Sequence, residues 1–147
     1  MTVTVSTHQS EEDIRNEDIL IYLNGKIVPK NEAVVSVYDS GFMLGDGVWE
    51  GLRLYNNIWA FCDEHIDRLF EAALAIDLDI GLNKSDVIDA LVKTQKSNGM
   101  ENNAHARLMV RGDPKKDPFN IQHYHKMAPQ LLLLWSTLFP KYQGLYR

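Results

Sequence analysis

Alternation of hydrophobic and polar positions predicts a series of short strands at the start of the chain. Residues 19–23 (ILIYL) and 26–28 flank Asn24-Gly25, a pair typical of a two-residue hairpin turn. Residues 33–37 are also short and rich in β-branched side chains, so we expect a further strand there.

Residues 48–55 (VWEGLRLY) are predicted to form a strand with two different faces. One face carries Val48, Glu50, Leu52 and Leu54, and the other carries Trp49, Gly51, Arg53 and Tyr55. The first has the composition of a core face, and Glu50 is the one residue that does not fit it. Asn56-Asn57 can make a tight turn, after which residues 58–61 should return antiparallel.

Two helices follow. The first is expected to be capped by Asp63, and its apolar positions are Ile66, Leu69, Phe70, Ala73 and Leu74. Arg68 lies nearly opposite these positions, so its side chain should point away from the helix's own core. The second helix should begin after a Ser85 cap and stop near Gly99.

Two more strands are predicted after the helices. Residues 104–111 alternate, with His105, Arg107, Met109 and Arg111 on the non-core face. A long polar loop at 112–126 leads to residues 129–137 (PQLLLLWST), a continuous apolar run typical of a strand buried on both faces. The element order predicts an α+β two-layer sandwich, a mostly antiparallel sheet with two helices on one face.

Composition narrows the class of protein. The chain has 147 residues, about the length of one domain, with 45% hydrophobic and 24% charged residues. A net charge of −5 without a basic block argues against nucleic acid as a partner. No apolar run approaches the ~20 residues that cross a bilayer. One cysteine, Cys62, and no signal-like start lead us to expect a cytoplasmic protein.

Generic chemical motifs are mostly missing. Four glycines between residues 41 and 51 suggest backbone that turns tightly or is approached closely by a ligand; a β-bulge with two ordinary turns is the alternative. No P-loop and no GxGxxG occur. His105, His123 and His125 form only a weak metal pattern, and we expect no metal site. Ser40 and Cys62 have no identifiable base.

The non-core faces nevertheless collect cations and aromatic rings. The non-core sides of the two predicted strands carry Trp49, Arg53 and Tyr55 on one and His105, Arg107 and Arg111 on the other. The helix adds Arg68 on its own non-core side. Arginine binds carboxylate and phosphate groups bidentately, so this combination favours an anion site with an apolar wall. The alternative is a solvated Arg68 that pairs with Glu64 and Glu71 on its own helix, beside an ordinary wet sheet face.

The motifs GFMLGDGVWEGLRLY and DEHIDRL, with YLNGKIVP before them and HARLMVRG after, identify a resemblance. The chain resembles the N-terminal domain of the class IV aminotransferases over residues 19–147. These fold-type IV enzymes use pyridoxal 5'-phosphate and comprise branched-chain and D-amino acid aminotransferases and aminodeoxychorismate lyase. The combination of motifs is more specific than any one of them.

The resemblance implies roles for individual residues. Arg68 would grip the cofactor phosphate, and Trp49 would border the substrate pocket. His105 and Arg107 would handle the substrate's side chain or carboxylates. Leu44 stands where many members have tyrosine or phenylalanine, and His105 replaces a tyrosine common in branched-chain enzymes. The loop at 112–126 would reach a neighbouring subunit, which implies a homodimer.

Residues 1–18 are polar, with acidic residues at their end, and we expect them to form a loosely held arm. The resemblance implies that residues 19–138 are the N-terminal domain and that residues 139–147 start a connection to a missing C-terminal domain. The family's Schiff-base lysine would lie in that missing domain. We therefore expect no catalytic residue here and an inactive isolated chain. The intact enzyme would move an amino group between a branched-chain-like amino acid and a 2-oxo acid. A D-amino acid or lyase branch, and a non-catalytic dimerising domain, are the alternatives.

Overall fold

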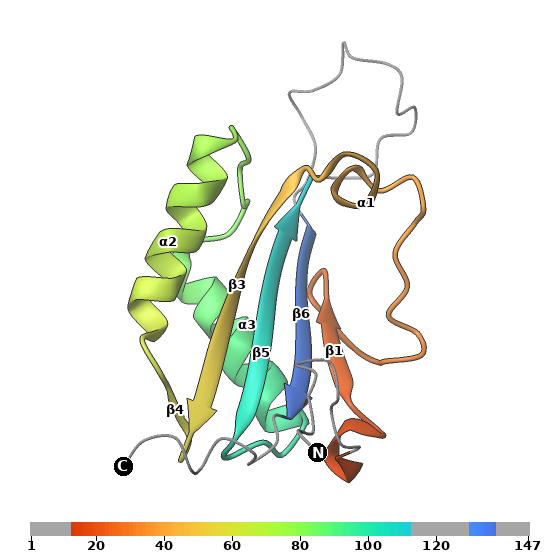
Figure 1. Cartoon of the computed structure of the whole chain (residues 1–147), viewed down its shortest axis with the longest axis vertical. Helices are drawn as coiled ribbons and strands as arrows, with labels where there is room; N and C mark the ends of the chain where they lie inside the picture. Colours follow the sequence, from red (N-terminus) through yellow and green to blue (C-terminus); the bar gives the residue numbers. More distant parts are fainter. Residues whose placement is uncertain (1–12, 113–129, 138–147) are drawn as a thin grey trace, which may run out of the picture.

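The computed structural model describes residues 13–112 and the backbone of residues 130–137. These residues form a six-stranded sheet with the order β2-β1-β6-β5-β3-β4, in which every pairing is antiparallel (Figure 1). The strands are β1 (Leu20–Leu23), β2 (Lys26–Pro29), β3 (Gly47–Tyr55), β4 (Ile58–Trp59), β5 (Ala104–Arg111) and β6 (Gln130–Thr137). The helices are η1 (Ile14–Asn16), α1 (Ser40–Leu44), α2 (Cys62–Ala75) and α3 (Lys84–Ser97). The predicted α+β architecture is confirmed.

The core lies between the sheet and the two long helices. In Figure 1, α2 lies alongside β3 and α3 crosses behind β3 and β5. Leu52 and Leu54 of β3 are fully buried, as are Ala106 and Leu108 of β5. They meet apolar positions of the helices, namely Ile66, Leu69, Ala73, Val87, Ala90 and Leu91. The core faces predicted for the two strands are therefore confirmed. Leu74, predicted among the apolar positions of the first helix, is instead 80% exposed, because it lies in the last turn of α2 and turns away from the sheet.

The two predicted hairpin turns are present. Asn24 and Gly25 have φ of 49° and 87°, and Asn56 and Asn57 have φ of 49° and 62°. A two-residue hairpin turn of this kind requires positive φ at both central positions, and asparagine and glycine tolerate it best. The strand after the second turn is shorter than predicted, because β4 contains only Ile58–Trp59.

The strand predicted at 33–37 is wrong. This segment pairs with none of the described strands, and Val34 and Val37 are exposed. β-branched composition alone cannot make a strand where no neighbouring strand supplies hydrogen bonds.

Both predicted helix caps are also wrong, by two residues each. Phe61, with φ of 52°, precedes α2, so Asp63 lies in the first turn. Asn83 caps α3 in place of Ser85, because Asn83 and Asp86 exchange side-chain and backbone hydrogen bonds in a capping box.

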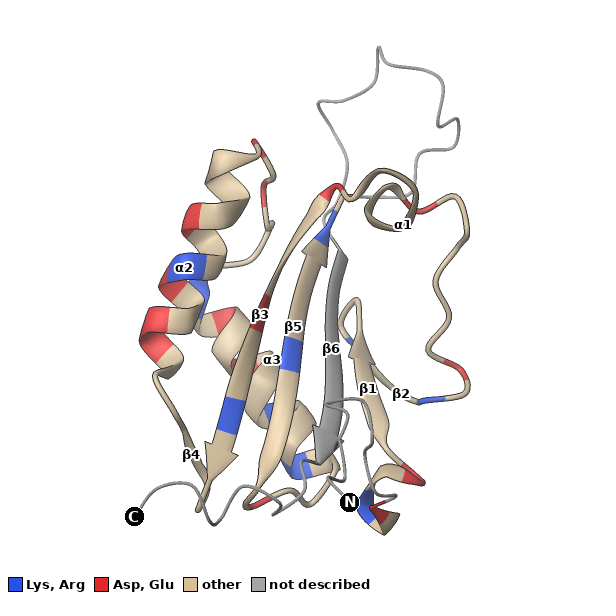
Figure 2. Cartoon of the chain, in the orientation of Figure 1, with Lys and Arg blue, Asp and Glu red and all other residues tan. Residues whose placement is uncertain are grey.

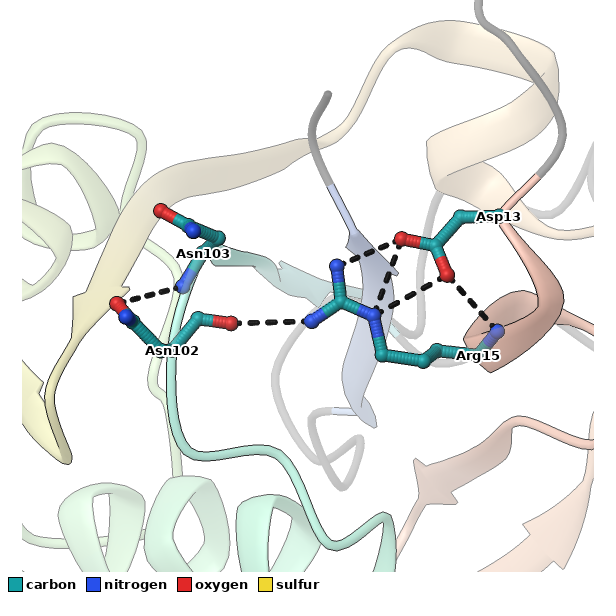
Figure 3. A network of polar contacts seen from close by, with 4 residues as sticks. All are labelled: Asp13, Arg15, Asn102 and Asn103. Carbon is teal, nitrogen blue, oxygen red and sulfur yellow. Dashed lines mark hydrogen bonds and ion pairs between the residues drawn. The ribbon is translucent and has the colours of Figure 1, made fainter. Parts of the chain in front are cut away.

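The end of the predicted polar arm is attached to the domain. Residues 1–12 lie outside the described residues, but Asp13 caps η1 and pairs with Arg15. Arg15 also donates to the backbone oxygen of Asn102, at 3.2 Å, in the connection before β5 (Figure 3). The start of the described chain thus contacts the α3–β5 connection.

β6 occupies a central place in the sheet, between β1 and β5. This position agrees with the continuous apolar run from which the strand was predicted. None of the helices in the described part of the chain has the length and hydrophobicity that a membrane span requires.

Candidate functional site

The glycine-rich run forms a short helix, α1, and then enters β3. Asp39 caps this helix by accepting from the backbone N–H of Phe42 at 3.1 Å. Gly45 ends it with φ of 71°, a left-handed conformation that suits glycine. This helix was not predicted, because five residues are too few to show a helical period.

The glycines of β3 accommodate the chain's own atoms. A Cβ at Gly47 would lie 2.8 Å from the carbonyl oxygen of Val110, on the paired strand. A Cβ at Gly51 would lie 2.9 Å from Nε2 of His105. Close approach was predicted, but what approaches here is strand β5. Gly51 thereby makes room for the imidazole of a predicted site residue.

A buried ion pair joins the start of α1 to the end of β5. The Arg111 guanidinium contacts the Asp39 carboxylate, and their side chains are 8% and 1% exposed. Arg111 was placed among the arginines available to an anion, but in the structure its charge is balanced internally. Leu44, at the end of α1, remains 60% exposed.

Three predicted substrate residues lie together on the sheet face opposite the helices. The guanidinium carbon of Arg107 lies 4.6 Å from the centre of the Trp49 ring, in cation–π contact. Gly51 pairs with Arg107 across the strands, and Arg53 pairs with His105. Figure 2 shows a basic position on β3 and others, further up in the view, on the neighbouring strand β5. Trp49 is 59% exposed, so this face offers an aromatic surface beside positive charge.

His105, on this face, has a lowered pKa. Its half-buried position lowers the pKa first, and the positive charges of Arg53 and Arg107 lower it further. His105 is therefore neutral at pH 7, with one ring nitrogen that donates a hydrogen bond and one that accepts.

We expect Arg107→Gln to raise the pKa of His105 towards its ordinary value, because one neighbouring positive charge is lost. NMR titration of the imidazole Cε1–H signal measures this, with Lys93→Gln on the exposed side of α3 as the control. Because folding lowers this pKa, protonation of His105 should weaken the fold as the pH drops below about 6.5. An unchanged pKa in Arg107→Gln would contradict the arrangement.

Arg68 contacts neither of the two carboxylates, Glu64 and Glu71, that were considered as its partners from the sequence. Its Nε donates to Oε1 of Glu50 at 2.5 Å, and its Nη2 donates to Oε2 at 2.6 Å. Glu50 is on β3, whereas Glu64 and Glu71 are on Arg68's own helix. The Arg68 side chain is 64% exposed, in agreement with the prediction that it points away from the core of α2.

Glu50 and His65 also belong to this site, although neither was predicted from the sequence. Nδ1 of His65 lies 2.8 Å from Oε2 of Glu50. The hydrogen bond from Arg68 lowers the pKa of Glu50 most; burial opposes it, and His65 lowers it further. Glu50 is therefore a carboxylate at neutral pH although it is buried. The available signal was that Glu50 is the only acid on an otherwise apolar strand face.

The residues of the candidate site lie on two sides of β3. Trp49, His105 and Arg107 share the sheet face opposite the helices, which we call the open face. Glu50 and Arg68 lie on the side of α2. Trp49 and Glu50 are consecutive, so only the thickness of the strand separates the two groups at this point. A ligand with an anionic end at Arg68 and a reactive end near Trp49 would have to reach across β3.

No group of three potential metal ligands occurs in the described parts of the chain. His123 and His125 lie outside those parts, as does most of the loop at 112–126.

Comparison with known proteins gives a family and several relatives. The family model "Amino-transferase class IV" matches residues 47–147. A putative branched-chain-amino-acid aminotransferase of Methanocaldococcus jannaschii is 44% identical over 101 residues, which cover 67% of this chain and 35% of that protein. Aminodeoxychorismate lyase of Bacillus subtilis is 32% identical over 123 residues, covering 83% of this chain and 41% of the lyase. The chain thus spans less than half the length of either relative.

Solved structures show the same fold. The branched-chain amino acid aminotransferase of Escherichia coli superposes with a TM-score of 0.76 at 18% identity, covering 88% of this chain and 42% of that one. The branched-chain aminotransferase of Thermoproteus uzoniensis, solved with norvaline, gives a TM-score of 0.71 at 23% identity and covers 82% of this chain and 41% of that one.

Proposed function

Since this chain belongs to the amino-transferase class IV family, we propose that it forms the N-terminal part of a pyridoxal-phosphate-dependent aminotransferase. The observation that supports this most is the Arg68 guanidinium, bound on one side by Glu50 and exposed on the other. The substrates would be a branched-chain-like amino acid and a 2-oxo acid, given the 44% identity to a putative branched-chain enzyme.

The donor set of Arg68 fits a phosphate group. Two of its five N–H groups are used by Glu50, and the exposed head keeps the others for a second anion. Pyridoxal phosphate, when bound, would supply the carbonyl and ring chemistry that carries the amino group. This chain would contribute the grip on the phosphate, and the remaining contacts would come from outside the described residues.

The open face would receive the substrate. The Trp49 ring offers an apolar surface to a side chain, and Arg107, stacked on that ring, offers charge to a carboxylate. Neutral His105 adds a hydrogen-bonding group that does not compete with Arg107 for the anion. Leu44 would border this region from α1, where its side chain is exposed.

By itself the chain is proposed not to transfer amino groups, because no lysine here matches the family's Schiff-base lysine. We further propose a homodimer, as the family resemblance implies, and a cytoplasmic location, in keeping with the single cysteine. The relation to a lyase at 32% identity keeps that branch, like the D-amino acid branch, as an alternative for the intact enzyme.

The affinities of the chain for pyridoxine 5'-phosphate and for pyridoxine test whether Arg68 binds a phosphate group. Neither compound has an aldehyde that could react with lysines. We expect the 147-residue chain to prefer the phosphate ester, and Arg68→Gln to remove most of that preference. Equilibrium dialysis measures both affinities, with Arg15→Gln as the matched control. Equal affinity of the unaltered chain for the two compounds would contradict the proposal.

A further inference from the structure

Glu50 fixes the plane of the Arg68 guanidinium. Two short hydrogen bonds run from Nε at 2.5 Å and from Nη2 at 2.6 Å to the two carboxylate oxygens. Nη1 of Arg68 makes no hydrogen bond with the described residues. A guanidinium bound along its Nε–Nη2 edge therefore presents its Nη1 end to the solvent.

Glu50 is itself held in place. Its side chain is 6% exposed, and His65 lies against it. Nδ1 of His65 is 2.8 Å from Oε2 of Glu50 and 3.2 Å from Nη2 of Arg68. A carboxylate only accepts and Nη2 only donates, so the shorter contact assigns the hydrogen to Nδ1, which donates to Glu50.

We infer that Glu50 is a positioning residue, which holds Arg68 so that its Nη1 end receives a phosphate group. The inference rests on the proposed function of Arg68. An exposed arginine loses conformational freedom when it binds an anion, and here folding has already ordered its head. His65 supports the same geometry through Glu50.

Glu50 has two opposing effects on an anion at Arg68. Its negative charge repels the anion, while its two hydrogen bonds orient the guanidinium. Removing the carboxylate would strengthen anion binding if repulsion dominated and weaken it if orientation dominated. The sign of the change therefore separates a positioning residue from a nearby charge.

The experiment titrates the 147-residue chain with inorganic phosphate and follows binding by ³¹P NMR line width. We expect Glu50→Gln to weaken phosphate binding about two- to tenfold, although it removes a negative charge. Glu64→Gln and Glu71→Gln remove the same charge from exposed positions beside Arg68 on α2 and should leave binding unchanged or slightly stronger.

Glu50→Asp is a second variant, which keeps the charge and shortens the side chain by one methylene. A positioning role predicts weaker binding here too, whereas a purely electrostatic role predicts no change. The ¹H–¹⁵N signal of Arg68 Nε reports orientation directly. We expect it to be sharp and slowly exchanging in the unaltered chain and broadened in both Glu50 variants.

The outcomes separate this inference from the proposed function. If Arg68→Gln abolishes phosphate binding while Glu50→Gln and Glu50→Asp bind as tightly as the Glu71 control, the positioning role is overturned and the phosphate grip stands. If Arg68→Gln binds phosphate as the unaltered chain does, the proposed function fails, and the role of Glu50 fails with it.

Discussion

Asp39→Asn should destabilise the fold by about 3–5 kcal/mol, because it removes one partner of a buried ion pair and leaves the Arg111 charge in place. Asparagine has the same shape and can still accept the N-cap hydrogen bond from Phe42. The decrease in the free energy of unfolding therefore reports the effect of the lost charge alone. Denaturant unfolding followed by circular dichroism measures it.

Two comparisons make this result specific. Asp89→Asn changes the same group at an exposed position of α3 and should cost no more than about 0.5 kcal/mol. Adding Arg111→Met to Asp39→Asn removes both charges, and replacement of a whole buried pair is often close to neutral. The double variant should recover much of the lost stability. Equal costs for Asp39→Asn and Asp89→Asn would contradict a buried pair between α1 and β5.

Arg107→Gln should have the largest effect on substrate binding in an intact enzyme. A suitable enzyme is a chimera in which this chain replaces the matching segment of the Methanocaldococcus jannaschii relative. We expect the KM for 2-oxoglutarate to rise about ten- to a hundredfold, because the contact between Arg107 and the second carboxylate of this substrate is lost. The KM for leucine should change much less, since its side chain has no carboxylate and would meet Trp49.

Lys93→Gln in the same chimera is the control, because this exposed residue of α3 lies on the opposite side of the sheet. A similar rise in KM for both substrates in Arg107→Gln would mean that Arg107 supports the structure of the open face. It would then not select the dicarboxylate. In that case Arg107 would be removed from the proposed substrate site.

Local sequence patterns were sufficient to predict most of the elements of the fold. The turns at Asn24 and Asn56 follow from the preference of asparagine for positive φ, and strand β5 follows from strict alternation. Predictions failed where distant residues decide the outcome. The segment at 33–37 has strand-like composition but no partner among the described strands. Helix α1 depends on a cap, Asp39, whose ion-pair partner Arg111 lies on a strand far along the chain.

The candidate site shows the same limit. The open face with Trp49, His105 and Arg107 could be predicted, because register and alternation place those residues together. The partner of Arg68 could not, since Glu50 precedes it by 18 positions and belongs to another element. His65 and Arg68 are three residues apart on α2, so the sequence could predict that they lie on the same side of the helix. The buried acid that they share became apparent only from the packing of α2 on β3.

The most direct test of whether this chain is the N-terminal part of a class IV aminotransferase is an assay of amino transfer. It uses the chimera with the Methanocaldococcus jannaschii relative, without further substitutions. The relative itself, assayed in parallel, is the positive control. We predict that the chimera, loaded with pyridoxal phosphate, forms glutamate from L-leucine and 2-oxoglutarate, while the 147-residue chain alone does not. A folded, cofactor-loaded chimera that transfers no amino group from L-leucine, where the relative does, would contradict the proposed function.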